Sequence, residues 1–360
     1  MYCIPILLGG ITLGATAQDI SASATPTQPV SAPSAAEHDP YVPSSVELLR
    51  EEAARVLRTV NTPGAKRWLV ATNWLPIHDP RTVYVNKEKR TALGASAWSA
   101  LAESERETYE ARPLEEKYFY YTRYGSPLAY ARALDLACEH WGGGPSCFAS
   151  KRILDYGYGG IGHLRLLASL GAHATGVDID PILAALYSQS GDTGEVPGVG
   201  MGGDIAPNGS LTLLHGRWPG EPVVREAAGG DYDLILSKNT LKKGYIHPAQ
   251  EVDKRMLVDL GVDDAAFLNA VAGALKPGGL FIIYNICPKQ NPEKYIPWAD
   301  GHCPFDRALM ESAGLEIIEF DKEDTPATRA LGRALGWDRG DHPMDIENDT
   351  FAWVTVARKK

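Results

Sequence analysis

A glycine-rich turn placed directly after a short apolar run is the feature that most constrains the fold of this 360-residue chain. The turn occupies residues 157–162, and a helix-forming segment, 163–170, follows it at once. Glycine lets the backbone approach a ligand closely, and the first turn of the helix presents unpaired amides there. A second apolar run then ends at Asp178, whose carboxylate is placed to accept ribose hydroxyls. These features predict a βαβ unit with a nucleotide-binding edge.

Beyond residue 150 the chain keeps alternating short Val/Ile/Leu runs with helical segments. Seven strands are predicted, at residues 152–156, 174–178, 211–215, 232–237, 280–285, 315–320 and 351–357. Strands that alternate with helices are typical of a mostly parallel sheet covered on both faces. We therefore expect an α/β fold with a doubly wound, mostly parallel, seven-stranded Rossmann-like sheet.

Two cofactor classes share this geometry, because Gly157, Gly159 and Gly162 also match the dinucleotide fingerprint. Three features favour S-adenosylmethionine over NAD. Asp155 stands two residues before the first glycine, where a carboxylate would repel a pyrophosphate but suits the cationic amino group of methionine. The sequence Leu-Lys-Pro-Gly-Gly at 275–279 predicts a turn that feeds an apolar strand. The last predicted strand ends near Lys360, so no separate catalytic domain is expected after it.

The segments DYGYGGIGHLRLLASLGAHATGVDID, at 155–180, and LKPGG, at 275–279, resemble the class I S-adenosylmethionine-dependent methyltransferases. The resemblance spans roughly residues 126–360 and implies methyl transfer from S-adenosylmethionine to an acceptor. It also implies that Asp178 holds the ribose and that Ile179 packs on the adenine. The residues implied to hold the methionine part are Asp155, Gly157, Tyr158 and Gly159, with Gly160 as a further candidate in the same turn.

Two departures from the family pattern affect the adenine end of the site. Ile161 stands where the family usually has its third glycine. After the third strand the family often has an acidic residue for the adenine amino group, but here Arg217 and Trp218 follow Gly216. Arg217 and Trp218 are therefore candidates for contacting the cofactor, although a position in the core is the simpler explanation of Trp218. The glycine-rich segment 191–209 predicts a surface insertion, in which Asp204 is a weak substitute for the missing acid.

The methyl acceptor is harder to predict, because methyl transfer requires chiefly alignment and needs a base only when the nucleophile must lose a proton. The turn at 237–240 lies where the family places residues near the methyl group, and Lys238 in it is a candidate site residue. The turn lacks the Asn/Asp-Pro-Pro-aromatic pattern of amide and base methylation. Tyr245, His247 and Asn285 could contact substrate or belong to structural or solvated segments. The catalytic residues stay unassigned.

Residues 44–125 predict a helical N-terminal cap. Ser44 and Glu47 form a capping box before a helical pattern that runs to Pro63, and a strand-like run follows at 67–72. A short extended segment at 82–85 and a helix over 95–111 complete the cap. Within the aromatic run 118–124, Tyr121 and Tyr124 are candidate cofactor contacts. The cap is expected to cover the site and set substrate choice, or else to cover a sheet face or form a dimer surface.

The first 43 residues predict an export signal and a linker. Residues 4–14 form an apolar stretch of signal-peptide length, followed by Ala15-Thr16-Ala17, which fits a cleavage site, although no Lys or Arg precedes it. Residues 18–43 are rich in Ser, Ala, Thr and Pro and predict a disordered linker. We expect a periplasmic or secreted protein without a stable membrane anchor, with a cytoplasmic protein as the alternative. An exported chain would need a source of S-adenosylmethionine in its compartment.

Cysteines and charge narrow the chemistry further. Cys138 and Cys147 could pair across a glycine-rich turn and Cys287 with Cys303 across a proline-rich loop, or all four could be free thiols. No zinc-type spacing occurs, so no metal site is predicted. The net charge of −10 disfavours nucleic acid as a substrate. A small-molecule substrate is expected instead. Three functions stay open: a methyltransferase, an NAD-dependent oxidoreductase, and a methyltransferase-like protein that binds S-adenosylmethionine without turnover.

Overall fold

A twisted eight-stranded sheet forms the centre of the structure, a computed structural model that describes residues 42–123, 125–201, 203–341 and 343–360. The predicted signal segment and nearly all of the predicted linker lie outside the described residues. The strands of the sheet are β4 (Arg152–Tyr156), β5 (His173–Asp178), β6 (Gly194–Val196), β9 (Gly209–His215), β10 (Tyr232–Lys238), β11 (Leu275–Cys287), β12 (Leu315–Glu323) and β13 (Phe351–Lys359). All seven predicted strands are confirmed, and β6 is an addition from the 191–209 insertion.

The order of the strands is β12-β13-β11-β10-β4-β5-β9-β6. Strands β9, β5, β4, β10 and β11 are parallel, whereas β13 runs antiparallel between β11 and β12. From β4 the chain first builds toward β5 and β9, then returns to the other side of β4 for β10 and β11. This doubly wound fold, as predicted from the resemblance to class I methyltransferases, has its topological switch point between β4 and β10. Ligands of open α/β sheets bind at the carboxyl ends of such strands.

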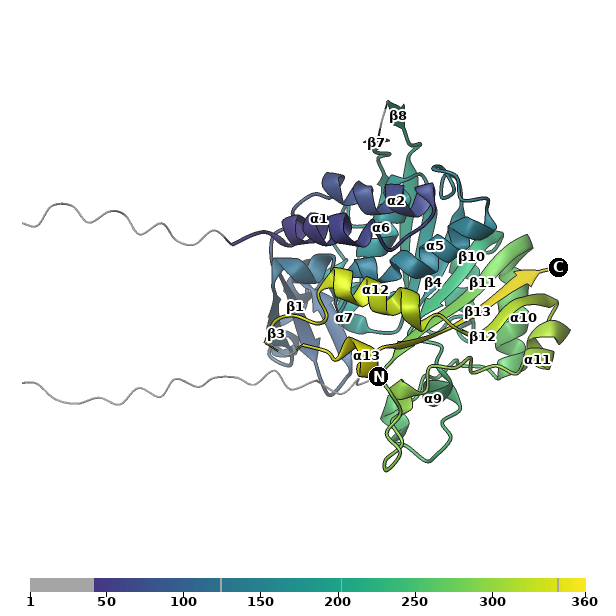
Figure 1. Ribbon diagram of the computed structural model, residues 1–360. Helices are drawn as coiled ribbons and strands as arrows, with labels where there is room; N and C mark the ends of the chain where they lie inside the picture. Colours follow the sequence, from purple (N-terminus) through teal and green to yellow (C-terminus); the bar gives the residue numbers. More distant parts are fainter. Residues whose placement is uncertain (1–41, 124, 202, 342) are drawn as a thin grey trace, which may run out of the picture.

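Two layers of helices cover the sheet, because its strands are apolar on both faces. On β4, for example, Ile153 belongs to one buried cluster and the next residue, Leu154, to the other. The first layer contains α5 (Ala131–His140), α6 (Gly162–Ser169), α7 (Pro181–Leu186) and α12 (Thr325–Leu335). The second contains α8 (Pro222–Ala228), α10 (Asp264–Ala274) and α11 (Arg307–Ser312). Short helices α9 (Lys243–Ile246) and α13 (Ile346–Asp349) lie in connecting segments (Figure 1).

The N-terminal region begins with two helices rather than a helix and a strand. Helix α1 (Ser45–Val56) starts at the predicted capping box, but the predicted strand at 67–72 is wrong, because α2 (Pro63–Val70) and a 3₁₀ turn (Ala71–Trp74) occupy it. Thr62 caps α2 and Pro63 opens it, which favours a helix there. Helix α1 packs on α2 and α12, and α2 packs on α5 and α6. These two helices therefore cover one layer of the domain.

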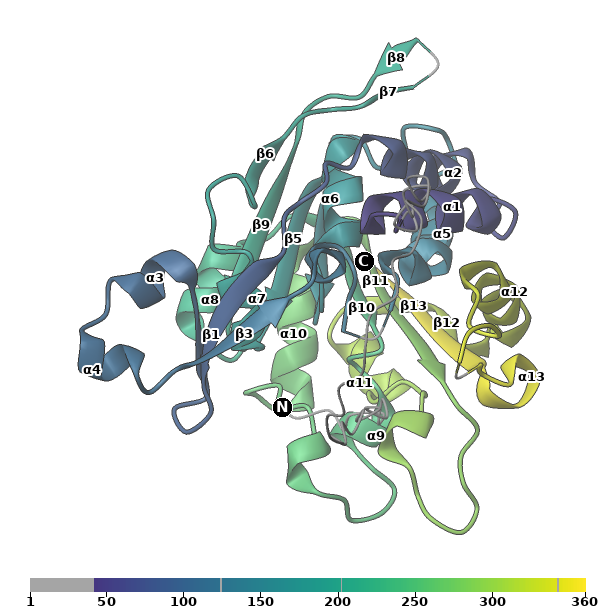
Figure 2. The same cartoon turned by 90° about the vertical axis from the view of Figure 1, so that its left-hand side faces the viewer.

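The rest of the N-terminal region is a small antiparallel sheet, which the prediction of a helical cap missed. Strand β1 (Arg81–Asn86) pairs with β2 (Thr91–Gly94) and β3 (Glu110–Leu114), and only short helices, α3 (Ala95–Ser99) and α4 (Glu103–Arg106), replace the predicted helix over 95–111. Trp98 stacks on Tyr84 of β1 at 4.0 Å between ring centroids, which holds α3 against the sheet. This small sheet lies against α7 (Figure 2).

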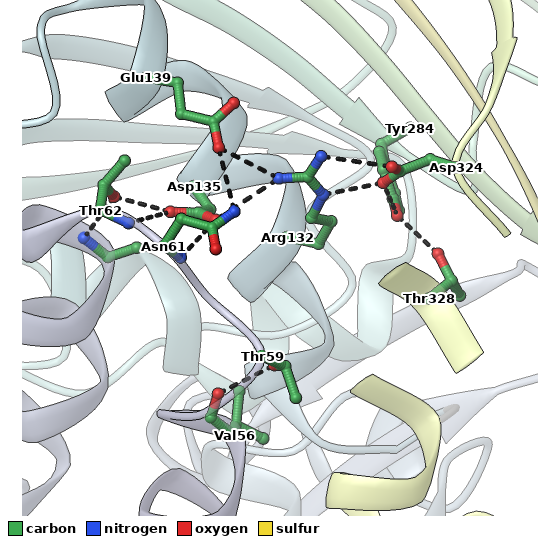
Figure 3. Close-up of polar contacts among 11 residues, drawn as sticks. Val56, Thr59, Asn61, Thr62, Arg132, Asp135, Glu139, Tyr284, Asp324 and Thr328 are labelled. Atoms are coloured by element: carbon green, nitrogen blue, oxygen red, sulfur yellow. Dashed lines mark hydrogen bonds and ion pairs between the residues drawn. The ribbon is translucent and has the colours of Figure 1, made fainter. Parts of the chain in front are cut away.

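A buried polar network joins the N-terminal helices to the central domain (Figure 3). Asp135 of α5, which is fully buried, accepts hydrogen bonds from the backbone amides of Asn61 and Thr62 at 2.9 and 2.8 Å, and from the Thr62 hydroxyl at 2.7 Å. Arg132, one turn earlier on α5, pairs with Asp324 at the start of α12, at 2.9 Å. Each buried acceptor thus has donors, as buried polar groups require.

The cysteines follow only half of the predicted pairing. Cys138 and Cys147 form a disulfide, and Gly64 of α2 lies against it, because a Cβ at Gly64 would come 2.2 Å from the Cys147 sulfur. Cys287 and Cys303 are free and buried, so the second predicted disulfide is wrong. Each of these thiols lies in apolar core, where it packs as a small hydrophobic side chain.

The 191–209 insertion forms β6 and a hairpin of β7 (Gly200–Met201) and β8 (Asp204–Ile205) that projects from the body (Figure 2). Beyond the hairpin, Pro207 lies against Gly171, where a Cβ would come 2.6 Å from the proline ring. Gly171 precedes β5, so the insertion leaves the domain at the amino ends of the strands. Asp204 is therefore not placed beside the glycine-rich turn. Among the described residues, no helix is long and apolar enough to cross a membrane.

Candidate cofactor site

The glycine-rich turn lies at the switch point of the sheet, between β4 and α6. Gly157 and Gly159 have φ angles of +78° and +60°, which favour glycine. The Gly157 amide donates to the carbonyl of Val177 on β5 at 2.8 Å, and a Cβ at Gly157 would lie 2.2 Å from the hydroxyl of Thr240. The turn is thus held between β5 and the segment after β10, with its backbone at the carboxyl edge of the sheet.

Asp178, the last residue of β5, points its carboxylate toward this turn. Its Oδ2 accepts from the Gly159 amide at 3.1 Å, and its Oδ1 accepts from the Asp180 amide at 2.9 Å. Burial raises the pKa of the Asp178 carboxyl, and the two amides oppose that shift. The backbone therefore fixes the orientation of a partly exposed carboxylate that keeps lone pairs for further donors. Ile179, the predicted adenine contact, follows it and is also partly exposed.

Asp155, the last residue but one of β4, has an internal partner. It is fully buried, and its Oδ2 lies 2.6 Å from Nε2 of His163, which is also fully buried in the first turn of α6. The ring of Tyr130 stacks on the imidazole, with centroids 3.6 Å apart. The expectation that Asp155 faces the cofactor therefore differs from the structure, because the carboxylate is fully buried and its Oδ2 is bonded to His163.

Lys238 ends β10 beside β4, as predicted for a residue near the site. Its ammonium lies 5.1 Å from the centroid of the Tyr130 ring, a cation–π contact. Burial, together with the nearby charge of Lys242, lowers the pKa of Lys238 to about 8, whereas Asp155 opposes the shift. Asp155, His163, Tyr130 and Lys238 thus form a continuous row from the interior to the edge of the sheet.

Four other predicted contacts lie elsewhere. Tyr158 is buried against Gly176 and Tyr187 rather than facing a ligand, and Gly160 is covered by the backbone of Tyr121 and Thr122. The adenine contact expected of Trp218 is wrong, because its ring is buried between Tyr156 and Phe267. Arg217 is exposed and forms ion pairs with Glu221 and Asp259. The large apolar faces of Tyr158 and Trp218 explain their burial better than a ligand does.

The segment before α5 reaches the glycine-rich turn from the N-terminal region. The Tyr121 hydroxyl donates to Glu52 of α1 at 3.3 Å, and the Ser126 hydroxyl donates to the same carboxylate at 2.5 Å. Burial raises the pKa of Glu52 and also that of Tyr121. The hydroxyl of Tyr121 thus binds α1, while its backbone covers Gly160. Tyr124, the other aromatic candidate, lies outside the described residues.

Three residues after β10 or at the end of β11 were predicted as possible substrate contacts, and they lie in different places. His247 pairs with Asp264 at 2.7 Å, and both line an open groove of about 530 Å³ beside the start of α10. Tyr245 lies next to this segment, partly buried. Asn285 is buried and donates to the carbonyls of Leu241 and Gly301, so its role is structural. No three His, Cys, Asp or Glu side chains within the described ranges are grouped as a metal site.

Comparison with known proteins gives only remote similarities. No protein-family model matches the sequence, and no curated protein matches it. Among solved structures, the chain is similar to the [4+2]-cyclase SpnF, at 15% identity and a TM-score of 0.36, over 63% of this chain and 80% of that one. The chain is also similar to an S-adenosylmethionine dependent methyltransferase from Mesorhizobium loti, at 17% identity and a TM-score of 0.34. This match covers 64% of this chain and 98% of that one. The arsenic(III) S-adenosylmethionine methyltransferase CrArsM from Chlamydomonas reinhardtii is similar at 17% identity and a TM-score of 0.32. This match covers 59% of this chain and 64% of that one.

Tyr130 and His163 are the residues at this edge that the sequence interpretation missed, whereas Thr240 belongs to the turn at 237–240 that it named. His163 carried a detectable signal, since it opens the helical segment at 163–170, close in the chain to the predicted buried acid Asp155. Tyr130 carried none, because its contact with His163 joins segments distant in sequence. The fold is doubly wound, and this edge lies at its switch point, where ligands of open α/β sheets bind.

Proposed function

We propose that the protein transfers a methyl group from S-adenosylmethionine to a small-molecule acceptor. The observation that carries the proposal is the oriented carboxylate of Asp178 beside the glycine-rich turn, at the switch point of a doubly wound sheet. The turn would fit a nucleoside cofactor, because Gly157 and Gly159 are partly exposed at the carboxyl edge of the sheet and adopt conformations that favour glycine. Asp178 would accept the ribose hydroxyls, and Ile179 would pack on the adenine.

The same site favours S-adenosylmethionine over NAD. The dinucleotide fold has six strands in the order 3-2-1-4-5-6. Here an antiparallel strand, β13, lies between β11 and β12 instead. The buried Asp155 adds to this preference only indirectly, since its charge is taken up by His163. The strand order therefore supports the choice of cofactor more strongly than the acid before the turn.

Bound S-adenosylmethionine supplies a sulfonium-activated methyl group, and the chain's own residues align it. The reaction is an in-line displacement, so orientation supplies most of the catalysis. Asp178 and the turn fix the nucleoside end, while Lys238 and Thr240 lie at the edge where the methionine end would extend. The groove beside His247 and Asp264 is the candidate acceptor surface, since its lining residues belong to the segment that leads from the carboxyl end of β10 to α10.

A second candidate function is a non-catalytic protein that binds S-adenosylmethionine. The observation that favours it is that Asp155, expected to hold the methionine end of the cofactor, is bonded to His163 instead. One experiment separates the two functions. The purified chain is incubated with S-adenosylmethionine carrying a labelled methyl group and a panel of small amines, phenols, carboxylates and thiols. We expect labelled product from at least one class, and Asp178→Ala to abolish most of it. Binding of S-adenosylmethionine without transfer to any acceptor would support the non-catalytic protein.

We also propose that the protein acts outside the cytoplasm, after cleavage near Gln18. The predicted cleavage site and the Cys138–Cys147 disulfide support this location, because disulfides persist in oxidising compartments. Mass spectrometry of native, non-reduced material should give a chain starting near Gln18, a peptide linking Cys138 to Cys147, and free Cys287 and Cys303. A native chain that begins at Met1 and has all five of its cysteines reduced would contradict the proposed location.

A further inference from the structure

We propose that Lys238 is a specificity-determining residue that binds the carboxylate of the methionine moiety of S-adenosylmethionine. This inference rests on the proposed function and assigns the charged end of the cofactor to one side chain. Lys238 is the last residue of β10, the strand next to β4, and it pairs with Tyr284 of β11 on its other side. It therefore stands at the carboxyl edge, one strand away from the glycine-rich turn.

Lys238 has no carboxylate partner among the described residues around it. Among the described residues, no acidic side chain forms an ion pair with it, and its ammonium lies over the face of Tyr130, 5.1 Å from the ring centroid. The closest acid on β4, Asp155, is bonded to His163 at 2.6 Å behind that ring. Lys242, the neighbouring cation, donates to the carbonyls of Ile286 and Trp298 at 2.5 and 3.2 Å. A second cation thus lies nearby, and Asp155 offsets the charge of Lys238 only in part, because no carboxylate in the described part of the chain contacts the ammonium.

A partly buried ammonium without a counterion gains from an anionic ligand. Burial lowers the pKa of Lys238 to about 8, which means that its charged form is poorly compensated in the ligand-free protein. A carboxylate placed on the ammonium would restore that compensation through a charge-assisted hydrogen bond. The nucleoside end held by Asp178 contains no anion, so the methionine carboxylate is the group of the proposed cofactor that fits.

The residue proposed to hold the methionine end is thus a cation, whereas the sequence predicted an acid, Asp155. An acid before the turn was predicted to hold the methionine amino group, but the structure buries that acid and places a cation at the edge of the sheet. The methionine end would then be recognised first through its carboxylate. The proposed pairing accounts for a lysine at the end of β10, where no internal salt bridge needs one.

The test compares two ligands that differ in this one group, S-adenosylmethionine and its decarboxylated form, by calorimetry on the full chain. We expect the wild type to bind S-adenosylmethionine about 10- to 100-fold more tightly. Lys238→Met should reduce the preference to within about 3-fold, and Lys238→Arg should keep most of it. Lys243→Met is the matched control, since Lys243 is exposed five residues along the chain and should leave the preference unchanged.

The outcomes separate the inference from the proposed function. Equal affinity of the wild type for the two ligands, or an unchanged preference in Lys238→Met, would overturn the role of Lys238 while leaving cofactor binding intact. Failure of the wild type to bind either ligand, or S-adenosylhomocysteine, would overturn the proposed function and the inference with it. Lys238→Gln provides a second neutral variant should Lys238→Met not unfold cooperatively, and the same two criteria apply to it.

Discussion

His163 Nε2 lies 2.6 Å from Asp155 Oδ2, and both side chains are fully buried. This contact joins the end of β4 to the first turn of α6, the two elements that flank the glycine-rich turn. It therefore fixes the spacing of the turn from within, while Tyr130 closes the pair from the side of the N-terminal region. An acid that resembles a cofactor ligand in the sequence acts here as a structural anchor.

Removing His163 should destabilise the protein strongly, because it leaves Asp155 as a buried carboxylate without its partner. For His163→Leu we expect a loss of about 3–5 kcal/mol in the free energy of unfolding, measured by urea denaturation. Adding Asp155→Asn to this variant should restore part of the loss, since the unpaired charge is then gone. A cost below about 1 kcal/mol for His163→Leu would mean that the contact contributes little.

Asp178→Ala should weaken binding of S-adenosylhomocysteine by about 1.5–3 kcal/mol, the value of charge-assisted hydrogen bonds. The substitution also removes an acceptor from the Gly159 amide, so Asp178→Asn is compared with it. Asp180→Asn is the control: Asp180 caps α7 through the Ile182 amide, and asparagine keeps that cap. Full affinity in both Asp178 variants, with the fold intact, would exclude Asp178 from the site.

Asp135→Ala should detach the N-terminal helices from α5. The backbone amides of Asn61 and Thr62 then lose their buried acceptor, and we expect a loss of about 2–4 kcal/mol in the free energy of unfolding. Glu139→Ala, one turn along α5, removes an exposed ion pair with Arg132 and an exposed hydrogen bond from the Asn61 side chain, and should cost less than about 1 kcal/mol. Equal effects of the two substitutions would refute a special role for Asp135.

The carboxyl of Glu52 should make stability depend on pH. Burial raises its pKa in the folded chain above the ordinary value of 4.5, so the folded state binds its proton more tightly than the unfolded state. Stability should then fall as pH rises from about 4.5 through the raised pKa. Urea titrations across this range should show that decline in the wild type and a smaller one in Glu52→Gln. Parallel pH profiles of the two proteins would contradict the prediction.

The sequence predicted seven of the eight strands of the central sheet, because each of these seven is a local apolar run. It predicted the glycine-rich turn because the glycines and the acid that follows them are close in the chain. It failed where contacts between distant segments decide the outcome. Residues 67–72 became helical because their buried positions face α5 and α6, and Trp98 stacks on Tyr84 rather than extending a helix. Asp155 was assigned to the cofactor because the row with His163 and Tyr130 is visible only in three dimensions.

Direct titration calorimetry of the full chain with S-adenosylmethionine, S-adenosylhomocysteine and NAD tests the central claim, a cofactor site at the switch point beside Asp178. We predict that S-adenosylmethionine and S-adenosylhomocysteine bind with one site per chain, that Asp178→Ala weakens both, and that NAD gives no measurable heat of binding. Tight binding of NAD, or binding of S-adenosylhomocysteine that is indifferent to Asp178, would contradict it.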